Sequence, residues 1–202
     1  MTTVAAKEWR RSEEESAMKP WKTLQKETVF DASPYVSVSR QVVELPNGAR
    51  SDDFYQGDLR PFVVVVPVLP DGRILVFWQY KHGLGRASLT FPAGFVETGE
   101  APDDAIHREL MEETGYAAGA ISHLGEFVDN GNQRGCTGNY YVATGCVQQR
   151  QPNSGDLEEM EVKTVHPSEV DRALASGDIG IIHHAAVWAM AKARGLVPES
   201  AR

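Results

Sequence analysis

Apolar positions near the middle of the chain predict the strands of a buried sheet. Residues 61–69, PFVVVVPVL, are almost continuously apolar, which is typical of a strand covered on both faces. The turn sequence PDGR follows at 70–73, and 74–80 has the pattern of a strand returning in a hairpin. Further apolar stretches predict strands at 121–127 and 140–147.

Three other stretches carry the start and stop signals of helices. Pro102 suits a first helical turn because its missing N–H is not needed there, and Gly115 is a typical C-terminal cap. Helices are also expected at 166–175 and 183–194, each followed by a glycine. Strands that alternate with helices in this way indicate an α/β fold.

The N-terminal part of the chain has a different pattern. Residues 28–30 and 35–43 are β-rich, and Pro46-Asn47-Gly48 is a strong turn signal. The first residues of the chain are polar and charged and predict no core element. The expected organisation is a polar tail at 1–20, a small β domain at 21–58 and a main domain at 59–202.

Two polar segments interrupt the second half of the chain. Residues 129–139, DNGNQRGCTGN, are rich in Gly and Asn. The segment is too long and polar for a hairpin turn, so we expect a ligand-binding loop. A second polar loop at 148–156 precedes the acids Glu158 and Glu159.

Composition and charge exclude several classes of protein. A chain of 202 residues with 42% hydrophobic and 24% charged residues is typical of one globular domain with a small accessory piece. The net charge of −8 argues against a nucleic-acid partner. No apolar run approaches the ~20 residues of a membrane span. The two cysteines, Cys136 and Cys146, lack metal-site spacing, so we expect a cytoplasmic protein with reduced thiols and no membrane contact.

Candidate chemistry gathers on the helix that starts at Pro102. Residues three and four apart share a helix face, so Glu109, Glu112 and Glu113 project to one side and repel one another. Oxygen ligands of this kind select Mg²⁺, Mn²⁺ or Ca²⁺, and Mg²⁺ is commonly shared with substrate phosphates. The alternative interpretation is a solvated acidic face on which Arg108 pairs with Glu112.

The spacing of these residues favours the metal site. The stretch GFVETGEAPDDAIHRELMEETGY resembles the Nudix box, which has the pattern G, five residues, E, seven residues, R-E, an aliphatic, any residue, E-E, any residue, G. The matching residues are Gly94, Glu100, Arg108, Glu109, Leu110, Glu112, Glu113 and Gly115. Tyr116 stands where the family has an aliphatic or similar residue.

The resemblance to Nudix hydrolases implies a fold and a reaction. The expected fold is an α/β/α sandwich with a mixed sheet, plus the small N-terminal β domain. The family hydrolyses nucleoside diphosphates linked to another group with a divalent metal, Mg²⁺ or alternatively Mn²⁺. Its pattern implies metal ligation by Glu109, Glu112, Glu113 and the carbonyl of Ala93, while Arg108 orients Glu112.

Weaker similarities point to the ADP-ribose pyrophosphatases of this family. Gln79-Tyr80-Lys81 stands where they commonly carry Q-Y-R, which implies that Lys81 contacts substrate phosphate, with Arg60 as a further candidate. Their catalytic loop implies Glu158, or else Glu159, as the general base. The layout of residues 21–58 is similar to their N-terminal domain and implies a homodimer.

The substrate implied by this subgroup is ADP-ribose, a nucleoside diphosphate sugar, which would be split into AMP and ribose 5-phosphate. Two departures keep other substrates open: Thr90 replaces a common Glu, and Gly131 stands about where ADP-ribose-specific members have Pro. Arg134 is a candidate phosphate or base contact that compensates. The alternatives are another nucleotide sugar, a dinucleotide or a dinucleotide cofactor, and a non-catalytic nucleotide-sugar-binding module. For His183 and His184 we expect a helix-start or surface role.

Overall fold

The computed structural model describes residues 18–153 and 160–199. The strands are β1 (Lys22–Ala32), β2 (Val36–Glu44), β3 (Arg50–Leu59), β4 (Phe62–Val68), β5 (Ile74–Lys81), β6 (Arg86–Thr90), β7 (Ala93–Phe95), β8 (Tyr116–Ala117), β9 (Ala120–Asn130), β10 (Arg134–Thr144), β11 (Val147–Gln148) and β12 (Met160–Val165). The helices are α1 (Pro102–Thr114), α2 (Pro167–Ser176) and α3 (Ile182–Ala193).

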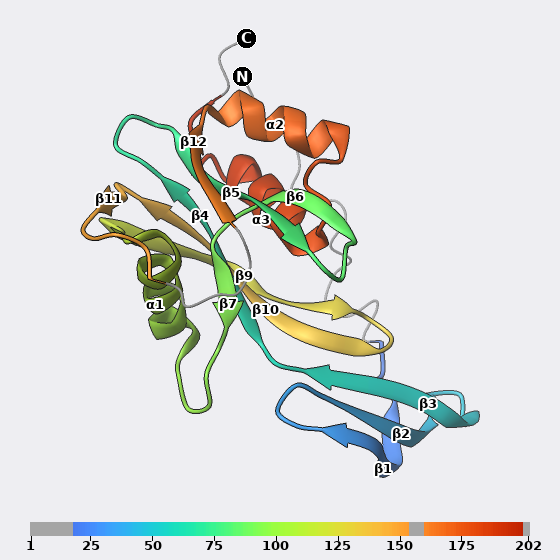
Figure 1. The fold of residues 1–202 in the computed structure, drawn as a ribbon. Coiled ribbons are helices and arrows are strands. Elements are labelled where there is room, and N and C mark those ends of the chain that lie inside the picture. Colours follow the sequence, from blue (N-terminus) through green and yellow to red (C-terminus); the bar gives the residue numbers. More distant parts are fainter. Residues whose placement is uncertain (1–17, 154–159, 200–202) are drawn as a thin grey trace, which may run out of the picture.

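One large mixed sheet runs through the molecule (Figure 1). Its strands follow the order β1-β2-β3-β10-β4-β5-β12, with β6 paired to β5, β7 to β4 and β9 to β10. Strand β10 runs parallel to β4, whereas β9 and β12 pair with their neighbours in antiparallel fashion. Strands β8 and β11 form a separate two-stranded sheet.

The central strand β4 is covered on both faces, as its apolar run predicts. Val64 and Val66 belong to a core cluster with residues of α2 and α3, while Val63 and Val65 belong to a second cluster with residues of α1. Successive side chains of a strand point to opposite faces, so a strand between two helical layers needs apolar residues at every position.

The helices begin and end close to their expected positions. Helix α1 starts with Pro102 in its first turn, and Gly115 ends it in the left-handed conformation with φ 76°. Helix α2 has a capping box, in which the side chain of His166 accepts from the backbone N–H of Ser168 and that of Glu169 accepts from the N–H of His166. These local signals explain why the helices could be predicted from the sequence.

The prediction of a loop at 129–139 is wrong, because most of this segment is a β-hairpin. Strands β9 and β10 pair across it, with Thr137 opposite Val128. The turn is tight because Asn130 Oδ1 accepts from the backbone N–H groups of Asn132 at 2.9 Å and Gln133 at 2.8 Å. The polar residues lie on exposed ends of the strands, which need no apolar side chains.

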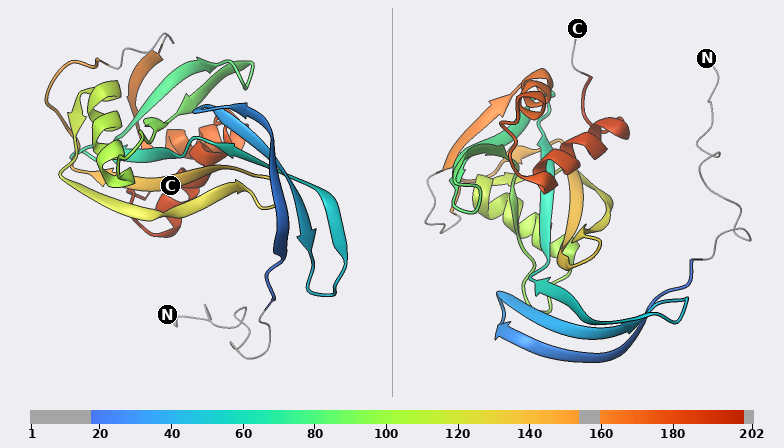
Figure 2. Two further views of the ribbon diagram at one scale, coloured as in Figure 1. Left: turned by 90° about the horizontal axis from the view of Figure 1, so that it is seen from below. Right: turned by 90° about the vertical axis from the view of Figure 1, so that its right-hand side faces the viewer.

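The N-terminal strands β1, β2 and β3 project from the rest of the chain (Figures 1 and 2). They pair in antiparallel order, and β3 joins the main sheet through two parallel pairs with β10, Arg134 with Gly57 and Gly135 with Asp58. The division into a domain at 21–58 and one at 59–202 stays a prediction.

Some expected features fall outside the described residues. Glu158 and Glu159, the expected general bases, belong to the segment 154–159, and most of the polar tail belongs to 1–17. In the part of the chain that the structure describes, no helix has both the length and the apolar character to cross a membrane.

Candidate active site

The acidic face of α1 lies directly against the backbone of β7. Oε2 of Glu113 accepts a hydrogen bond from the N–H of Ala93 at 3.0 Å, and the Glu113 side chain is buried. The next residue, Gly94, lies so close to Glu109 that a Cβ added to it would be 2.0 Å from the carboxyl carbon. A side chain at this position would therefore displace the Glu109 carboxylate.

Arg108 ties the acidic side chains together. Its guanidinium donates to Oε1 of Glu100 at 2.8 Å, to Oε1 of Glu109 at 2.7 Å and to Oε2 of Glu112 at 3.2 Å. It also donates to the carbonyl of Phe95 at 3.0 Å, which connects β7 to the helix. One cation thus offsets the repulsion among several carboxylates.

The charge of Arg108 has its largest effect on Glu100. Hydrogen bonds from Arg108 and then from the N–H of Glu97 lower the pKa of Glu100 to about 2. The hydrogen bond that Arg108 donates to the Glu100 carboxylate in turn raises the pKa of Arg108 above its usual range. The pair closes the loop between β7 and α1, because Glu100 lies at the end of that loop.

The oxygen donors around β7 and α1 suit a hard divalent cation. Ala93 directs its N–H toward α1, and Phe95 directs its carbonyl the same way. Since the N–H and carbonyl of an extended residue point to the same edge of a strand, the Ala93 carbonyl lies on that edge too. Within residues 18–153 and 160–199 no three acidic, His or Cys side chains are already arranged around one point as metal ligands would be.

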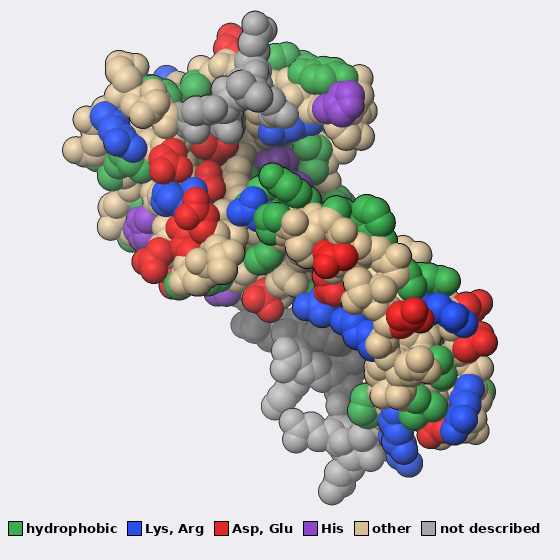
Figure 3. Space-filling model, turned by 60° about the horizontal axis from the view of Figure 1, so that its bottom comes forward, with side chains coloured by type: hydrophobic (Ala, Val, Ile, Leu, Met, Phe, Trp, Pro, Cys, Tyr) green, Lys and Arg blue, Asp and Glu red, His purple; other side chains and the backbone are tan. Residues whose placement is uncertain are grey.

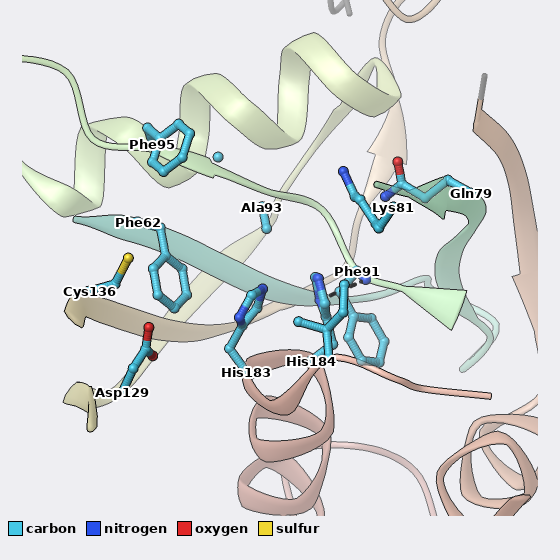
Figure 4. A pocket seen from close by; sticks show the side chains of 12 residues that line it. Phe62, Gln79, Lys81, Phe91, Ala93, Phe95, Asp129, Cys136, His183 and His184 are labelled. Atoms are coloured by element: carbon cyan, nitrogen blue, oxygen red, sulfur yellow. Dashed lines mark hydrogen bonds between the residues drawn. The ribbon is translucent and has the colours of Figure 1, made fainter. Parts of the chain in front are cut away.

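Beside this edge opens a cavity of about 330 Å³ with mainly apolar walls (Figure 4). Ala93 and Gly94 form part of its wall, so the cavity and the acidic face of α1 share the β7 backbone. The lining residues are Phe62, Gln79, Lys81, Phe91, Ala93, Gly94, Phe95, Asp129, Cys136, Ile181, His183 and His184. A concave, largely apolar pocket with a few polar groups is typical of a small-molecule site.

The helix-start role expected for His183 and His184 is confirmed, because both lie in the first turn of α3. The alternative surface role is wrong, because both line this cavity. His184 is buried, and its Nδ1 accepts from the N–H of Phe91 at 3.2 Å. His183 packs against the ring of Phe62, with ring centroids 4.6 Å apart. Burial lowers the pKa of His183 to about 4 and that of His184 well below its usual range. Both imidazoles are therefore neutral at pH 7.

The structure places Lys81 in the wall of the cavity, at the end of β5. Gln79, two residues earlier on the same strand face, donates from Nε2 to Oγ1 of Thr90 at 2.6 Å. Thr90 is fully buried, and this hydrogen bond gives its hydroxyl a partner inside the protein.

Neither candidate arginine is among the residues that line the cavity. The guanidinium of Arg60 lies over the ring of Phe95, which is a lining residue, 4.7 Å from its centroid. Arg134 lies at the tip of the β9–β10 hairpin with φ 66°, and its Nε lies 3.3 Å from Oδ1 of Asp58. Glu158 and Glu159 fall outside the described residues.

Asp129 and Cys136 also line the cavity, and both lie in the segment 129–139, for which the sequence predicts ligand binding. They stand on β9 and β10, and the parallel pairing of β10 with β4 brings them beside Phe62. Their types and spacing match no motif, so the sequence marks the segment but not these two residues.

The molecular surface has acidic and basic side chains close together over α1, next to hydrophobic side chains (Figure 3). Arg108 is only partly exposed at the centre of its carboxylate partners, with 25% of its side chain accessible. Among the carboxylates that Arg108 contacts, Glu112 is the most exposed, with 39% of its side chain accessible, whereas Glu109 has 13%.

Known proteins resemble this chain over much of its length. The ADP-ribose pyrophosphatase of Bacillus subtilis (strain 168) is 35% identical over 106 residues, which cover 52% of this chain and 56% of that protein. The chain therefore spans little more than half of that relative. The ADP-sugar pyrophosphatase of Mus musculus is 34% identical over 151 residues, 69% of this chain and 67% of that protein.

A crystal structure of an ADP compounds hydrolase has a similar fold, with a TM-score of 0.73 and 21% sequence identity, over 90% of this chain and 100% of that one. At this level of identity the similarity establishes the fold, and the expected α/β class is confirmed. The family model described as NUDIX domain matches residues 58–185, more than half of the sequence. The box at 94–115 lies inside this match, and the chain belongs to the Nudix family.

Proposed function

We propose that this chain hydrolyses the pyrophosphate bond of a nucleoside diphosphate linked to another group, with ADP-ribose as the substrate and AMP and ribose 5-phosphate as products. The observation that carries the proposal is the acidic face of α1 held against the β7 backbone at the edge of an apolar cavity. The names of the Bacillus subtilis and mouse relatives support this substrate class.

The proposed cofactor is Mg²⁺, with Mn²⁺ as an alternative. Glu109, Glu112, Glu113 and the Ala93 carbonyl would hold it, because they offer the hard oxygen ligands that these ions prefer. A divalent cation at this edge would supply the positive charge that offsets the phosphate oxygens of the substrate.

The chain's own residues would position the diphosphate for attack by water. Lys81 would contact a phosphate oxygen as a point charge from the cavity wall. Arg108 would hold Glu112 and Glu109 in place through its hydrogen bonds. Glu158, or alternatively Glu159, would accept the proton of the water. Arg60 and Arg134 stay candidate substrate contacts, and each would have to leave its present partner.

The test is a hydrolysis screen with and without Mg²⁺ over ADP-ribose, other nucleotide sugars, dinucleotides, dinucleotide cofactors and nucleoside triphosphates. We expect metal-dependent release of AMP and ribose 5-phosphate, with the highest kcat/KM for ADP-ribose. Preference for another compound would replace the substrate while keeping the chemistry. Tight binding of ADP-ribose without any turnover would instead indicate a binding module and overturn the proposed reaction.

We also propose that the chain forms a homodimer through its N-terminal strands and acts in the cytoplasm. The exposed apolar side chains of β1 support the assembly. The described cysteines, Cys136 and Cys146, are both free thiols, which suits a reducing compartment.

A further inference from the structure

A histidine of α3 is hydrogen-bonded to the backbone that leads into β7. His184 lies in the first turn of the helix, and its Nδ1 accepts from the N–H of Phe91 at 3.2 Å (Figure 4). Phe91 directly follows β6, and Pro92 separates it from Ala93, the first residue of β7. We call residues 91–93 the β7 entry segment. The hydrogen bond joins α3 to the segment that carries the Ala93 carbonyl.

The β7 entry segment is also bound from the other side of the sheet. The carbonyl of Pro92 accepts from the N–H of Val65 on β4 at 3.0 Å, and the N–H of Ala93 donates to Oε2 of Glu113 on α1 at 3.0 Å. Helices α1 and α3 pack on opposite faces of β4. The contact with His184 therefore completes a set of hydrogen bonds that fixes the segment between the two helical layers.

The N–H of Phe91 falls in the gap between two strand ladders. Strand β6 pairs with β5 up to Thr90, and the pairing of β7 with β4 includes Ala93 but not Phe91. Phe91 is buried, and a buried N–H without an acceptor is costly. Loss of the histidine acceptor would therefore favour a turn of the segment toward another partner.

Helix α3 also fixes the ring of Phe91. This ring is stacked with that of Trp188, with centroids 6.1 Å apart and an interplanar angle of 20°. Trp188 is fully buried and donates from Nε1 to Oδ1 of Asp171 on α2 at 2.8 Å. Since His184 and Trp188 are four residues apart, they share one face of the helix. That face holds both the backbone and the side chain of Phe91.

The His184 ring can accept this hydrogen bond because it is neutral. Burial, followed by the charges of His183 and Lys81, lowers its pKa well below the usual range. A neutral imidazole has one donor and one acceptor nitrogen, so acceptance at Nδ1 leaves the proton on Nε2. A phenylalanine at this position would provide a ring without an acceptor, whereas the Oδ1 of an asparagine could replace Nδ1.

We propose that His184 is a positioning residue for the metal site. By accepting from Phe91 it would fix the β7 entry segment and, with it, the direction of the Ala93 carbonyl. This inference rests on the proposed function, because the Ala93 carbonyl is one of the proposed Mg²⁺ ligands. His184 lies outside the Nudix box, and groups that orient the ligands of a metal typically change metal affinity or activity by about 10- to 100-fold.

The first test measures metal binding without catalysis. Titration with Mn²⁺, followed by electron paramagnetic resonance, should give a Kd about tenfold or more higher in His184→Phe than in the wild type. His184→Asn keeps an acceptor and should recover most of the affinity. The control is Val170→Ala, because Val170 belongs to the same core cluster as Phe91 but has no hydrogen-bonding group. It should lower the melting temperature and leave the Kd unchanged.

The second test uses the proposed reaction with ADP-ribose. His184→Phe should lower kcat more than it raises KM, because the change affects the metal site rather than the binding of the substrate. The Mg²⁺ concentration that gives half of the maximal rate should rise by about the same factor as the Kd of Mn²⁺. His184→Asn should again recover most of the loss, and Val170→Ala should keep the wild-type kinetics.

Nuclear magnetic resonance of the wild type keeps the inference testable if His184→Phe does not fold. The ¹⁵N resonances of His184 should place its proton on Nε2, and hydrogen exchange should show a protected Phe91 amide. Added Mg²⁺ should shift the amide resonance of Phe91 and leave that of Val170 in place. A proton on Nδ1, an unprotected Phe91 amide, or a Phe91 resonance that ignores Mg²⁺ would each overturn the inference.

The outcomes separate this inference from the proposed function. Mn²⁺ binding that depends on an acceptor at His184, without hydrolysis of any compound tested, would support the positioning role and refute the reaction. Metal-dependent hydrolysis with wild-type Mn²⁺ affinity in a folded His184→Phe would refute the positioning role and leave the reaction in place. Equal losses in His184→Phe and His184→Asn would show that the ring acts by packing alone, and the inference would be wrong.

Discussion

Single residues decide whether the acidic face of α1 can work. The three glutamates could be identified from the sequence because helix periodicity alone puts them on one side of α1. The contact between Glu113 and the Ala93 N–H could not, because it joins residues of two elements. Asp129 and Cys136 are harder still, since a hairpin brings them to the cavity and no motif marks them.

Replacing Glu113 tests the acidic face directly. Glu113→Gln removes one charged oxygen ligand and should lower kcat by several orders of magnitude under saturating Mg²⁺, while the fold survives because the amide keeps an oxygen acceptor for the Ala93 N–H. The control is the same change at Glu27, which is exposed on β1. Full activity of Glu113→Gln, measured with ADP-ribose, would remove Glu113 from the site.

At the scale of elements, sequence patterns predicted the strands and helices that have local signals. The β4–β5 hairpin and helices α1, α2 and α3 carry turn residues, caps or apolar runs that identify them. The short strands β6 and β7 have no such pattern, because they form by pairing with β5 and β4. The sequence predicts a loop where the β9–β10 hairpin forms, because the polar residues on its exposed strand ends have the composition of a loop.

The stability that the loop between β7 and α1 gives to the fold should depend on pH through Glu100. The pKa of Glu100 is lowered to about 2 from an ordinary value of 4.5 by Arg108. A carboxylate with a lowered pKa in the folded state stabilises the fold above its unfolded pKa, and this contribution is lost as the pH falls through the folded value. Glu100→Gln should therefore destabilise the protein most at pH 7, and the difference from the wild type should shrink between pH 4.5 and about 2.

Urea denaturation of wild type and Glu100→Gln at a series of pH values measures this difference. Because both proteins share all other titrating groups, the subtraction isolates Glu100. A difference in the free energy of unfolding that stayed constant from pH 7 down to pH 3 would show that Arg108 does not hold Glu100 as the structure indicates.

The pairing of β10 with β4, which places Gly138 opposite Phe62, gives a second prediction at this scale. A Cβ on Gly138 would lie 2.3 Å from the Phe62 ring, so Gly138→Ala must displace a buried aromatic side chain that also lines the cavity. We expect a loss of about 1–3 kcal/mol in the free energy of unfolding and a raised KM. The matched control is Gly131→Ala, where a Cβ would meet nothing within 4 Å. Equal stability of the two variants would contradict the packing.

At the scale of the whole molecule, the N-terminal strands remain to be explained. Strand β1 is exposed along its whole length, and only two parallel pairs join β3 to β10. Trp21, directly before β1, and Leu24, Val29 and Phe30 of β1 expose about half of their surface, which is unusual for so many large apolar side chains in one short stretch. A three-stranded layer with so little core of its own gains stability when another surface covers it.

The proposed homodimer provides such a surface and can be tested in solution. Light scattering after gel filtration should give twice the chain mass of 22.2 kDa for the wild type. Phe30→Asp should shift the protein toward the monomer, because a charge in a contact between apolar side chains would lose its water. Val147→Asp on β11 is the control, since Val147 is also exposed but lies outside the N-terminal strands. A wild type that stayed monomeric at high concentration would show that β1–β3 serve another purpose than assembly.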